Sequence, residues 1–303
     1  TQGVSSAASD VYKRQRSRDG FERDRRSVRG RQLRRATVAV TAVAALVLAL
    51  SGCVTTISDP PAPFLPPPAG ATPDYQLGGA YAPADGVGIV GRDRSDDPAE
   101  GLYSICYVNG FQTQPGELDT WPDDLVLQSG GEPLFDPDWP DEALLDTSTD
   151  DRRERIAEIV GPWIEGCAES GFEAVEFDNL DSYTRSDGAL TLDDNLALAA
   201  LLVDVAHDSG LAAGQKNAAE DAPLLRERAG FDFAVVEECS VYQECGAFTG
   251  VYGDAVIDIE YSDELPRSFA EMCADDEAPG SMVLRDRDLV TPGHEEYVFE
   301  TCS

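Results

Sequence analysis

The chain has 303 residues, a net charge of −34 at pH 7 and 42% hydrophobic residues, a composition that suits a globular protein with a sizeable core. Residues 1–52 hold 11 Lys and Arg against 4 Asp and Glu, so the remainder holds 12 against 53 and carries about −41. A surface this acidic repels phosphates, which excludes nucleic acid as a partner and leaves cationic ligands, metal ions or simple solubility as reasons for the charge.

The N-terminal region reads as an export signal. Residues 1–20 have no apolar periodicity, and we expect them to be a leader of uncertain origin outside the folded domain. A basic run at 23–35 leads into an apolar stretch at 36–50 and then to Cys53. Residues 21–53 thus resemble a bacterial lipoprotein signal, in which Cys53 is the lipidated residue. A transmembrane anchor is the alternative, but the apolar stretch is shorter than the ~20 residues that cross a bilayer. We expect an exported lipoprotein, anchored in the cell membrane on its extracytoplasmic side.

A tether and a set of cysteines follow. Residues 54–73 are rich in Pro and Ala and predict a semi-stiff linker.

Six further cysteines, an even number in an oxidising compartment, predict three disulfides: they are Cys106, Cys167, Cys239, Cys245, Cys273 and Cys302. Cys239 with Cys245 is the favoured pair because they close a short loop, and the other pairings stay open. The alternative, a zinc site, lacks both Cys-x-x-Cys spacing and a His partner, so we expect no metal.

Residues 74–303 alternate short apolar runs with helical stretches or loops. The predicted strands are 75–77, 87–90, 102–108, 143–145, 172–177, 211–213, 231–236, 256–259 and 282–284. The clearest helices are 151–170, interrupted at Gly161-Pro162, and 193–209. This alternation predicts a single α/β domain, a (β/α)₈ TIM-type barrel, and with nine candidate strands one is expected to be peripheral. An open doubly wound sheet is disfavoured because no glycine fingerprint follows the early strands.

Acidic residues gather where the predicted strands end, which is where a barrel exposes its active-site face. The two-residue period of a strand puts Glu176 and Asp178 on one face of their strand, and it puts Val235 and Glu237 on one face of another. Two carboxylates facing each other across a barrel mouth are the minimum equipment for cleaving a glycosidic bond. The sequence therefore predicts a carboxylate-lined active site.

Five ordered blocks resemble the endo-α-1,4-polygalactosaminidase family, glycoside hydrolase family 114. They are GFEAVEFDNLDSY at 171–183, AHDSGL at 206–211 with GQKN at 214–217, FDFAVVEEC at 231–239, YQEC at 242–245, and VIDIEY at 256–261. The chain departs from the family pattern at Val236, where an Asn is usual, and at Gln215, where a Leu is typical.

The resemblance implies a (β/α)₈ barrel that cleaves α-1,4-linked galactosamine-containing polysaccharide, which is cationic when deacetylated. Asp178 is similar to the proposed nucleophile and Glu237 to the proposed acid/base. Residues similar to substrate-binding or orienting positions are Lys216, Asn217, Tyr242, Glu260 and Tyr261. Asp178 and Glu237 are called the dyad below. Residues expected to support the dyad are Asn179, Asp181, Glu176 and Glu238.

Two other functions stay open. One is a noncatalytic carbohydrate-binding surface lipoprotein on the same barrel, because a fold alone does not establish an activity. The other is a glycosidase with a different sugar specificity. In each case we expect a monomer that needs no cofactor, takes polysaccharide as its partner and touches the membrane only through the lipid anchor.

Overall fold

A computed structural model of the protein describes residues 64–302. The leader, the signal ending at Cys53 and most of the tether lie outside the described residues. None of the helices within 64–302 is both long enough and apolar enough to cross a membrane.

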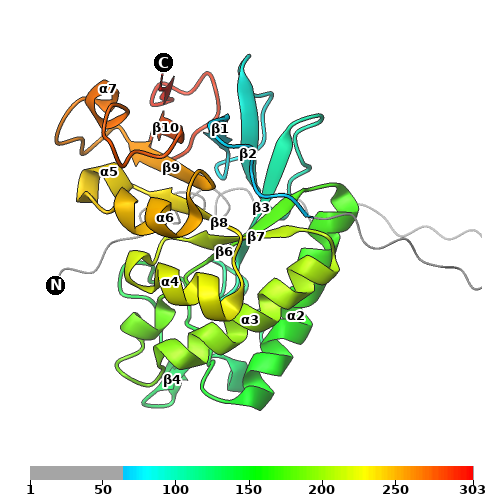
Figure 1. Ribbon diagram of the computed structural model, residues 1–303. Coiled ribbons are helices and arrows are strands. Elements are labelled where there is room, and N and C mark those ends of the chain that lie inside the picture. The colour runs from blue at the N-terminus through cyan, green and yellow to red at the C-terminus, as the bar shows by residue number, and fades with distance from the viewer. Residues whose placement is uncertain (1–63, 303) are drawn as a thin grey trace, which may run out of the picture.

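The core of the fold is a barrel of parallel strands (Figure 1). The strands, in the order in which they neighbour one another, are β1 (Thr72–Tyr75), β2 (Val87–Asp93), β3 (Tyr103–Asn109), β6 (Ala174–Asp178), β7 (Ala212–Lys216), β8 (Phe233–Glu237), β9 (Val256–Tyr261) and β10 (Ser281–Arg285). A ninth strand, β11 (Phe299–Thr301), pairs antiparallel with β10. The gap between β10 and β1 is bridged by Arg285, which donates to Asp74 Oδ1 at 3.0 Å and to the carbonyl of Tyr75. The predicted TIM-type barrel is confirmed.

The strands are buried on both faces, which explains their near-continuous apolar sequences. One hydrophobic cluster fills the barrel and includes Ile105, Ala174, Phe233, Ile257 and Val283. A larger cluster lies between the strands and the surrounding helices.

The helices are α2 (Asp150–Ser170), α3 (Leu192–Asp208), α4 (Ala222–Leu224), α5 (Cys239–Tyr242), α6 (Cys245–Tyr252) and α7 (Phe269–Met272), with a π-helical turn at Leu225–Ala229. The expected interruption of the first helix at Gly161-Pro162 is wrong, because α2 runs through both residues. A proline inside a helix costs about 3 kcal/mol. The ring of Pro162 faces solvent, while Ile156, Val160 and Ile164 on the other side of α2 are buried, and this packing offsets the cost.

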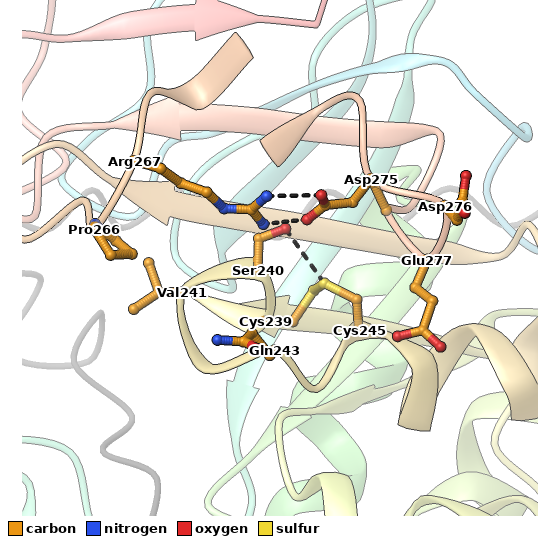
Figure 2. Close-up of a pocket in the computed structure, with 11 residues that line it drawn as sticks. Cys239, Ser240, Val241, Gln243, Cys245, Pro266, Arg267, Asp275, Asp276 and Glu277 are labelled. Atoms are coloured by element: carbon orange, nitrogen blue, oxygen red, sulfur yellow. Dashed lines mark hydrogen bonds and ion pairs between the residues drawn. A yellow bond between two sulfur atoms is a disulfide. The ribbon is translucent and has the colours of Figure 1, made fainter. Parts of the chain in front are cut away.

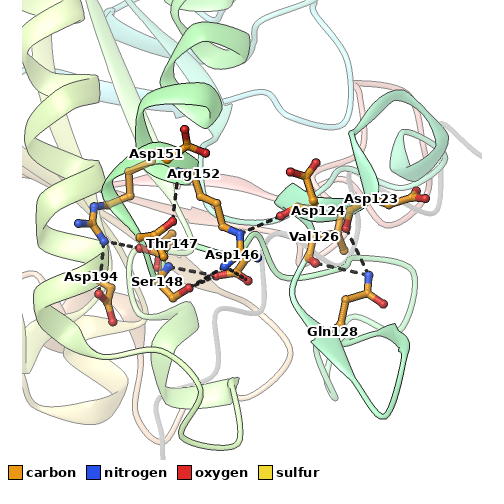
Figure 3. A network of polar contacts seen from close by, with 12 residues as sticks. Asp123, Asp124, Val126, Gln128, Asp146, Thr147, Ser148, Asp151, Arg152 and Asp194 are labelled. Carbon is orange, nitrogen blue, oxygen red and sulfur yellow. Dashed lines mark hydrogen bonds and ion pairs between the residues drawn. The ribbon is translucent and has the colours of Figure 1, made fainter.

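The predicted strand at 143–145 is not part of the barrel. Its residues form isolated bridges to Gln112, Val126 and Phe135 inside the long segment 110–149 between β3 and α2. This segment also contains two short 3₁₀ turns and a small hairpin: Leu118–Thr120, Asp123–Leu125, β4 (Gln128–Ser129) and β5 (Glu132–Pro133). Figure 3 shows how the start of α2 holds it: Arg152 donates to the Asp124 carbonyl at 3.0 Å and pairs with Asp146 at 3.1 Å. The segment is therefore fixed to the start of α2.

Residues 64–302 contain three disulfides, the number expected for an oxidising compartment. They join Cys106 to Cys167, Cys239 to Cys245 and Cys273 to Cys302, so the favoured short-loop pair is confirmed. The first ties β3 to α2 and the last ties the region of α7 to the C-terminal end.

The last residues of the predicted tether pack on the barrel. Phe64 stacks on His207 with ring centroids 4.1 Å apart, and Tyr103 donates to the Leu65 carbonyl at 2.7 Å. Tyr103 begins β3 and His207 lies near the end of α3, so this contact is at the N-terminal end of the strands. The described part of the tether therefore lies at the end of the barrel opposite the C-terminal ends of its strands.

Candidate active site

Three charged side chains end three adjacent strands. Asp178, Lys216 and Glu237 are the last residues of β6, β7 and β8, and each is at most 2% exposed. Because parallel strands in register bring their carboxyl ends together, the three side chains meet in the interior of the barrel mouth.

Lys216 lies between the two carboxylates. Its Nζ is 3.2 Å from Glu237 Oε2 and 4.0 Å from Asp178 Oδ1. Two oxygens at these distances from one nitrogen are at most 7.2 Å apart, a separation compatible with either a retaining or an inverting pair of carboxylates. Burial opposes the charged form of Lys216, but Asp178, Glu237 and Glu176 outweigh it and raise the pKa of the ammonium. Lys216 therefore supplies a fixed positive charge between the two carboxylates.

Tyrosine hydroxyls from the neighbouring strands hold the carboxylates, since β3 pairs with β6 and β9 pairs with β8. Tyr107 donates to Asp178 Oδ2 at 2.6 Å, and Tyr261 donates to Glu237 Oε1 at 2.5 Å. Burial and the neighbouring carboxylates raise the pKa of both hydroxyls well above the usual value. Both tyrosines thus remain donors at any pH at which the protein works.

The residue after each charged strand end has a left-handed backbone. Asn179, Asn217 and Glu238 have φ values of 63°, 49° and 59°. Asn tolerates this region better than most residues, whereas Glu does not, and such strain concentrates at functional sites. The turns have a use here: the Asn179 N–H donates to Asp178 Oδ1 at 2.9 Å, and Asn217 donates to Glu237 Oε2 at 3.0 Å while accepting from the Glu237 N–H at 2.9 Å.

The chain's similarity to known proteins agrees with this geometry. Residues 55–303 match the family model described as glycoside-hydrolase family GH114. The chain belongs to glycoside hydrolase family GH114.

Solved structures agree with this family at the level of the fold. The crystal structure of Aspergillus fumigatus Ega3 in complex with galactosamine is 23% identical, with a TM-score of 0.57, over 73% of this chain and 94% of Ega3. A variant of the glycoside hydrolase domain of PelA from Pseudomonas aeruginosa is 14% identical, with a TM-score of 0.50, over 74% of this chain and 96% of that domain. No curated protein matches the chain.

Some of the residues expected around the dyad form ion pairs at the mouth of the GH114 barrel. Asp181 lies 3.0 Å from Arg185, which also pairs with the buried Asp136 at 2.6 Å. On the other side, Glu238 pairs with Arg287 at 2.8 Å. Tyr242, at the end of α5, is 46% exposed, so its ring is available to a ligand.

Glu260 does not join this group. Ile257, Ile259 and Tyr261 face the barrel interior, so Asp258 and Glu260 face outward, where both are fully buried against α5. Glu260 Oε1 accepts the Ser240 N–H at 2.8 Å, and Asp258 Oδ1 accepts the Cys239 N–H at 3.3 Å. Burial and mutual proximity raise the pKa of Asp258 well above the usual value, and burial also raises the pKa of Glu260. The pair anchors the start of α5, and its burial favours the protonated form of the carboxyls.

We expect Glu260→Gln to leave KM for polysaccharide within about twofold of wild type, because the side chain does not reach the mouth. A Gln amide still accepts from Ser240 and can donate to Asp258. Since the wild-type pair binds its proton more tightly when folded, its contribution to stability falls as pH rises. The variant should therefore gain stability relative to wild type between pH 5 and pH 8, as measured by urea unfolding. A large rise in KM with unchanged stability would instead place Glu260 among the substrate-binding residues.

The sequence did not lead us to expect three other residues at the site, which are Tyr107, Asn109 and Glu142. Asn109, at the end of β3, accepts from Asn179 at 3.1 Å and donates to Glu142 Oε2 at 3.2 Å. Asn109 could have been identified as a polar residue at the end of a buried strand. Tyr107 lies two residues earlier on the same strand and faces the barrel interior, as the dyad does. Glu142 comes from segment 110–149, where no periodicity predicts which side chains turn inward.

A separate cavity of about 480 Å³ lies beside α5, outside the barrel mouth (Figure 2). The Cys239–Cys245 disulfide and the ion pair of Arg267 with Asp275 line it. The two sulfurs and an Asp258 oxygen lie within 4.8 Å of one another. Because both sulfurs are in a disulfide, this cluster lacks the thiolates that bind a metal.

Proposed function

We propose that this GH114 enzyme hydrolyses α-1,4-linked galactosamine-containing polysaccharide, with Asp178 as nucleophile and Glu237 as acid/base. The observation that carries the proposal is the placement of these two buried carboxylates on β6 and β8, around the single ammonium of Lys216. The galactosamine bound to Ega3 supports the choice of sugar.

In the first proposed step, an Asp178 oxygen attacks the anomeric carbon while the bond from that carbon to the leaving oxygen breaks. Glu237 gives its proton to the leaving oxygen. In the second step, the Glu237 carboxylate takes a proton from water, and the water oxygen displaces Asp178 from the anomeric carbon. Asn217 and Tyr261 keep Glu237 in one orientation through both steps, and Tyr107 does the same for Asp178.

The charge of the folded part suits a cationic polymer. The residues after 52 carry about −41, so a deacetylated chain with free amines is attracted over long range. This attraction should weaken as salt rises, because the Debye length falls from ~10 Å at 0.1 M to ~3 Å at 1 M.

The function is tested by incubating the full chain with galactosamine polymers of different acetylation, with glucosamine polymers and with neutral α-glucans. Release of reducing ends together with a rapid fall in chain length, from the galactosamine polymers alone, is the expected result. Binding without cleavage would favour a noncatalytic carbohydrate-binding protein, and cleavage of another polymer would change the specificity.

We also propose that the protein is exported and lipidated on Cys53. The three disulfides support export, since they persist in oxidising compartments. Incorporation of a labelled fatty acid by wild type but not by Cys53→Ala in a bacterial host is the test, and equal labelling of both would reject it.

A further inference from the structure

A third carboxylate lies in the barrel beneath the dyad. Glu176 precedes Asp178 by two residues on β6, faces the same interior and is fully buried. Tyr75 donates to its Oε1 at 2.9 Å. Among the described residues, no group donates a hydrogen bond to its Oε2. A buried carboxylate with one oxygen unpaired is costly to ionise, so this geometry favours the neutral acid.

Aromatic rings pack around Glu176 where two glycines of the barrel leave space for them. Tyr75 neighbours Gly91 on β2, where a Cβ would lie 2.6 Å from the Tyr75 ring. Glu176 neighbours Gly214 on β7, where a Cβ would lie 2.5 Å from the Phe233 ring. The two glycines thus leave room for aromatic rings that pack around the carboxylate, and Tyr75 can reach across the interior to it.

The charges around Glu176 do not balance. The titratable groups that face it are Tyr75 from β1, Tyr107 from β3, Asp178 from β6, Lys216 from β7 and Glu237 from β8. The tyrosines are neutral, so one ammonium serves three carboxylates. Burial raises the pKa of Glu176 to about 7, with Asp178 and Glu237 adding to the rise and Lys216 and Tyr75 opposing it.

We propose that Glu176 is a positioning residue whose own proton governs how tightly Glu237 holds the proton that it gives to the leaving group. This inference rests on the proposed function. When Glu176 is neutral, Lys216 compensates one of the two dyad charges. When Glu176 is ionised, the added negative charge makes Glu237 harder to deprotonate. Glu176 thereby extends the activity of the acid to higher pH.

The activity test compares Glu176→Gln with wild type in kcat/KM from pH 5.5 to pH 8.5, using the full chain. Gln copies the neutral acid but cannot ionise, so the ratio of variant to wild type should fall by several-fold to about tenfold as pH rises through 7, for like-charge coupling of about one pK unit. A loss that is the same at every pH would show a purely structural role and overturn the proposal. Asp254→Asn, which removes an exposed carboxylate that precedes β9 at the other end of the barrel, is the control and should give a ratio independent of pH in this assay.

An infrared measurement tests the proton without relying on activity. The difference spectrum of wild type minus Glu176→Gln should contain a carboxylic acid C=O band at pH 5.5 that disappears by pH 8.5. In Tyr75→Phe, which lacks the hydroxyl that stabilises the ionised form, the same band should persist to higher pH. Absence of the band at pH 5.5 would overturn the inference even if the polysaccharide is cleaved. If the band titrates but no polymer is cleaved, the proposed function fails and the proton on Glu176 stands.

Discussion

Glu237→Gln is expected to lower kcat/KM on a galactosamine polymer by ~10³-fold, because general acid catalysis contributes ~10²–10⁴-fold. The change removes the transferable proton, while a Gln oxygen can still accept from Tyr261. Asp178→Asn is expected to cost at least as much, because an amide is a poor nucleophile. Initial rates of reducing-end release on the full chain measure both losses.

Asp254→Asn is the matched control, since Asp254 is exposed and precedes β9 at the other end of the barrel. A glycosyl fluoride substrate distinguishes the acid/base role of Glu237 from the nucleophile role of Asp178, because fluoride leaves without needing a proton. Glu237→Gln should still complete the first step on this substrate and accumulate a glycosyl-enzyme, whereas Asp178→Asn should not. Wild-type activity in Asp178→Asn, or the opposite order of effects on the fluoride, would reject the assignment.

Lys216→Met is expected to destabilise the folded protein by about 3–5 kcal/mol at pH 8, the range found when one partner of a buried ion pair is removed. Lys216 is the only lysine among the described residues, and it is fully buried between Glu237 and Asp178. Without it, the neighbouring carboxylates have no compensating charge in the dry interior. Urea unfolding at pH 5 and pH 8 measures the effect.

The pH dependence distinguishes charge from packing. In Lys216→Met the pKa of each neighbouring carboxyl should rise, because the favourable ammonium is gone. The folded variant then binds more protons than the unfolded chain, so its deficit relative to wild type should shrink as pH falls. A deficit that is equal at pH 5 and pH 8 would mean that Lys216 acts only by filling space. Activity should be lost at both pH values, since Lys216 also holds the dyad together.

Much of the barrel could be predicted from local sequence because its strands are short, apolar and separated by loops or helices. The apolar character of the strands did not reveal which face of β9 is turned to the barrel interior. In VIDIEY both faces of β9 are buried, so alternation separates Asp258 and Glu260 from Tyr261 but does not say which set faces the interior. The family resemblance grouped Glu260 with Tyr261, and only the packing of α5 against the outer face of β9 separates them.

By itself the sequence determined the strand alternation, the acidic charge, the short-loop cysteine pair and the positions of Asp178 and Glu237 at the ends of their strands. These are local properties, set by a two-residue period and by neighbours along the chain. Only the tertiary structure decided which tyrosine holds which carboxylate, that Glu142 turns toward Asn109, and that three carboxylates share one lysine. These relations join residues far apart in the chain, and closure of the barrel brings those residues together in space.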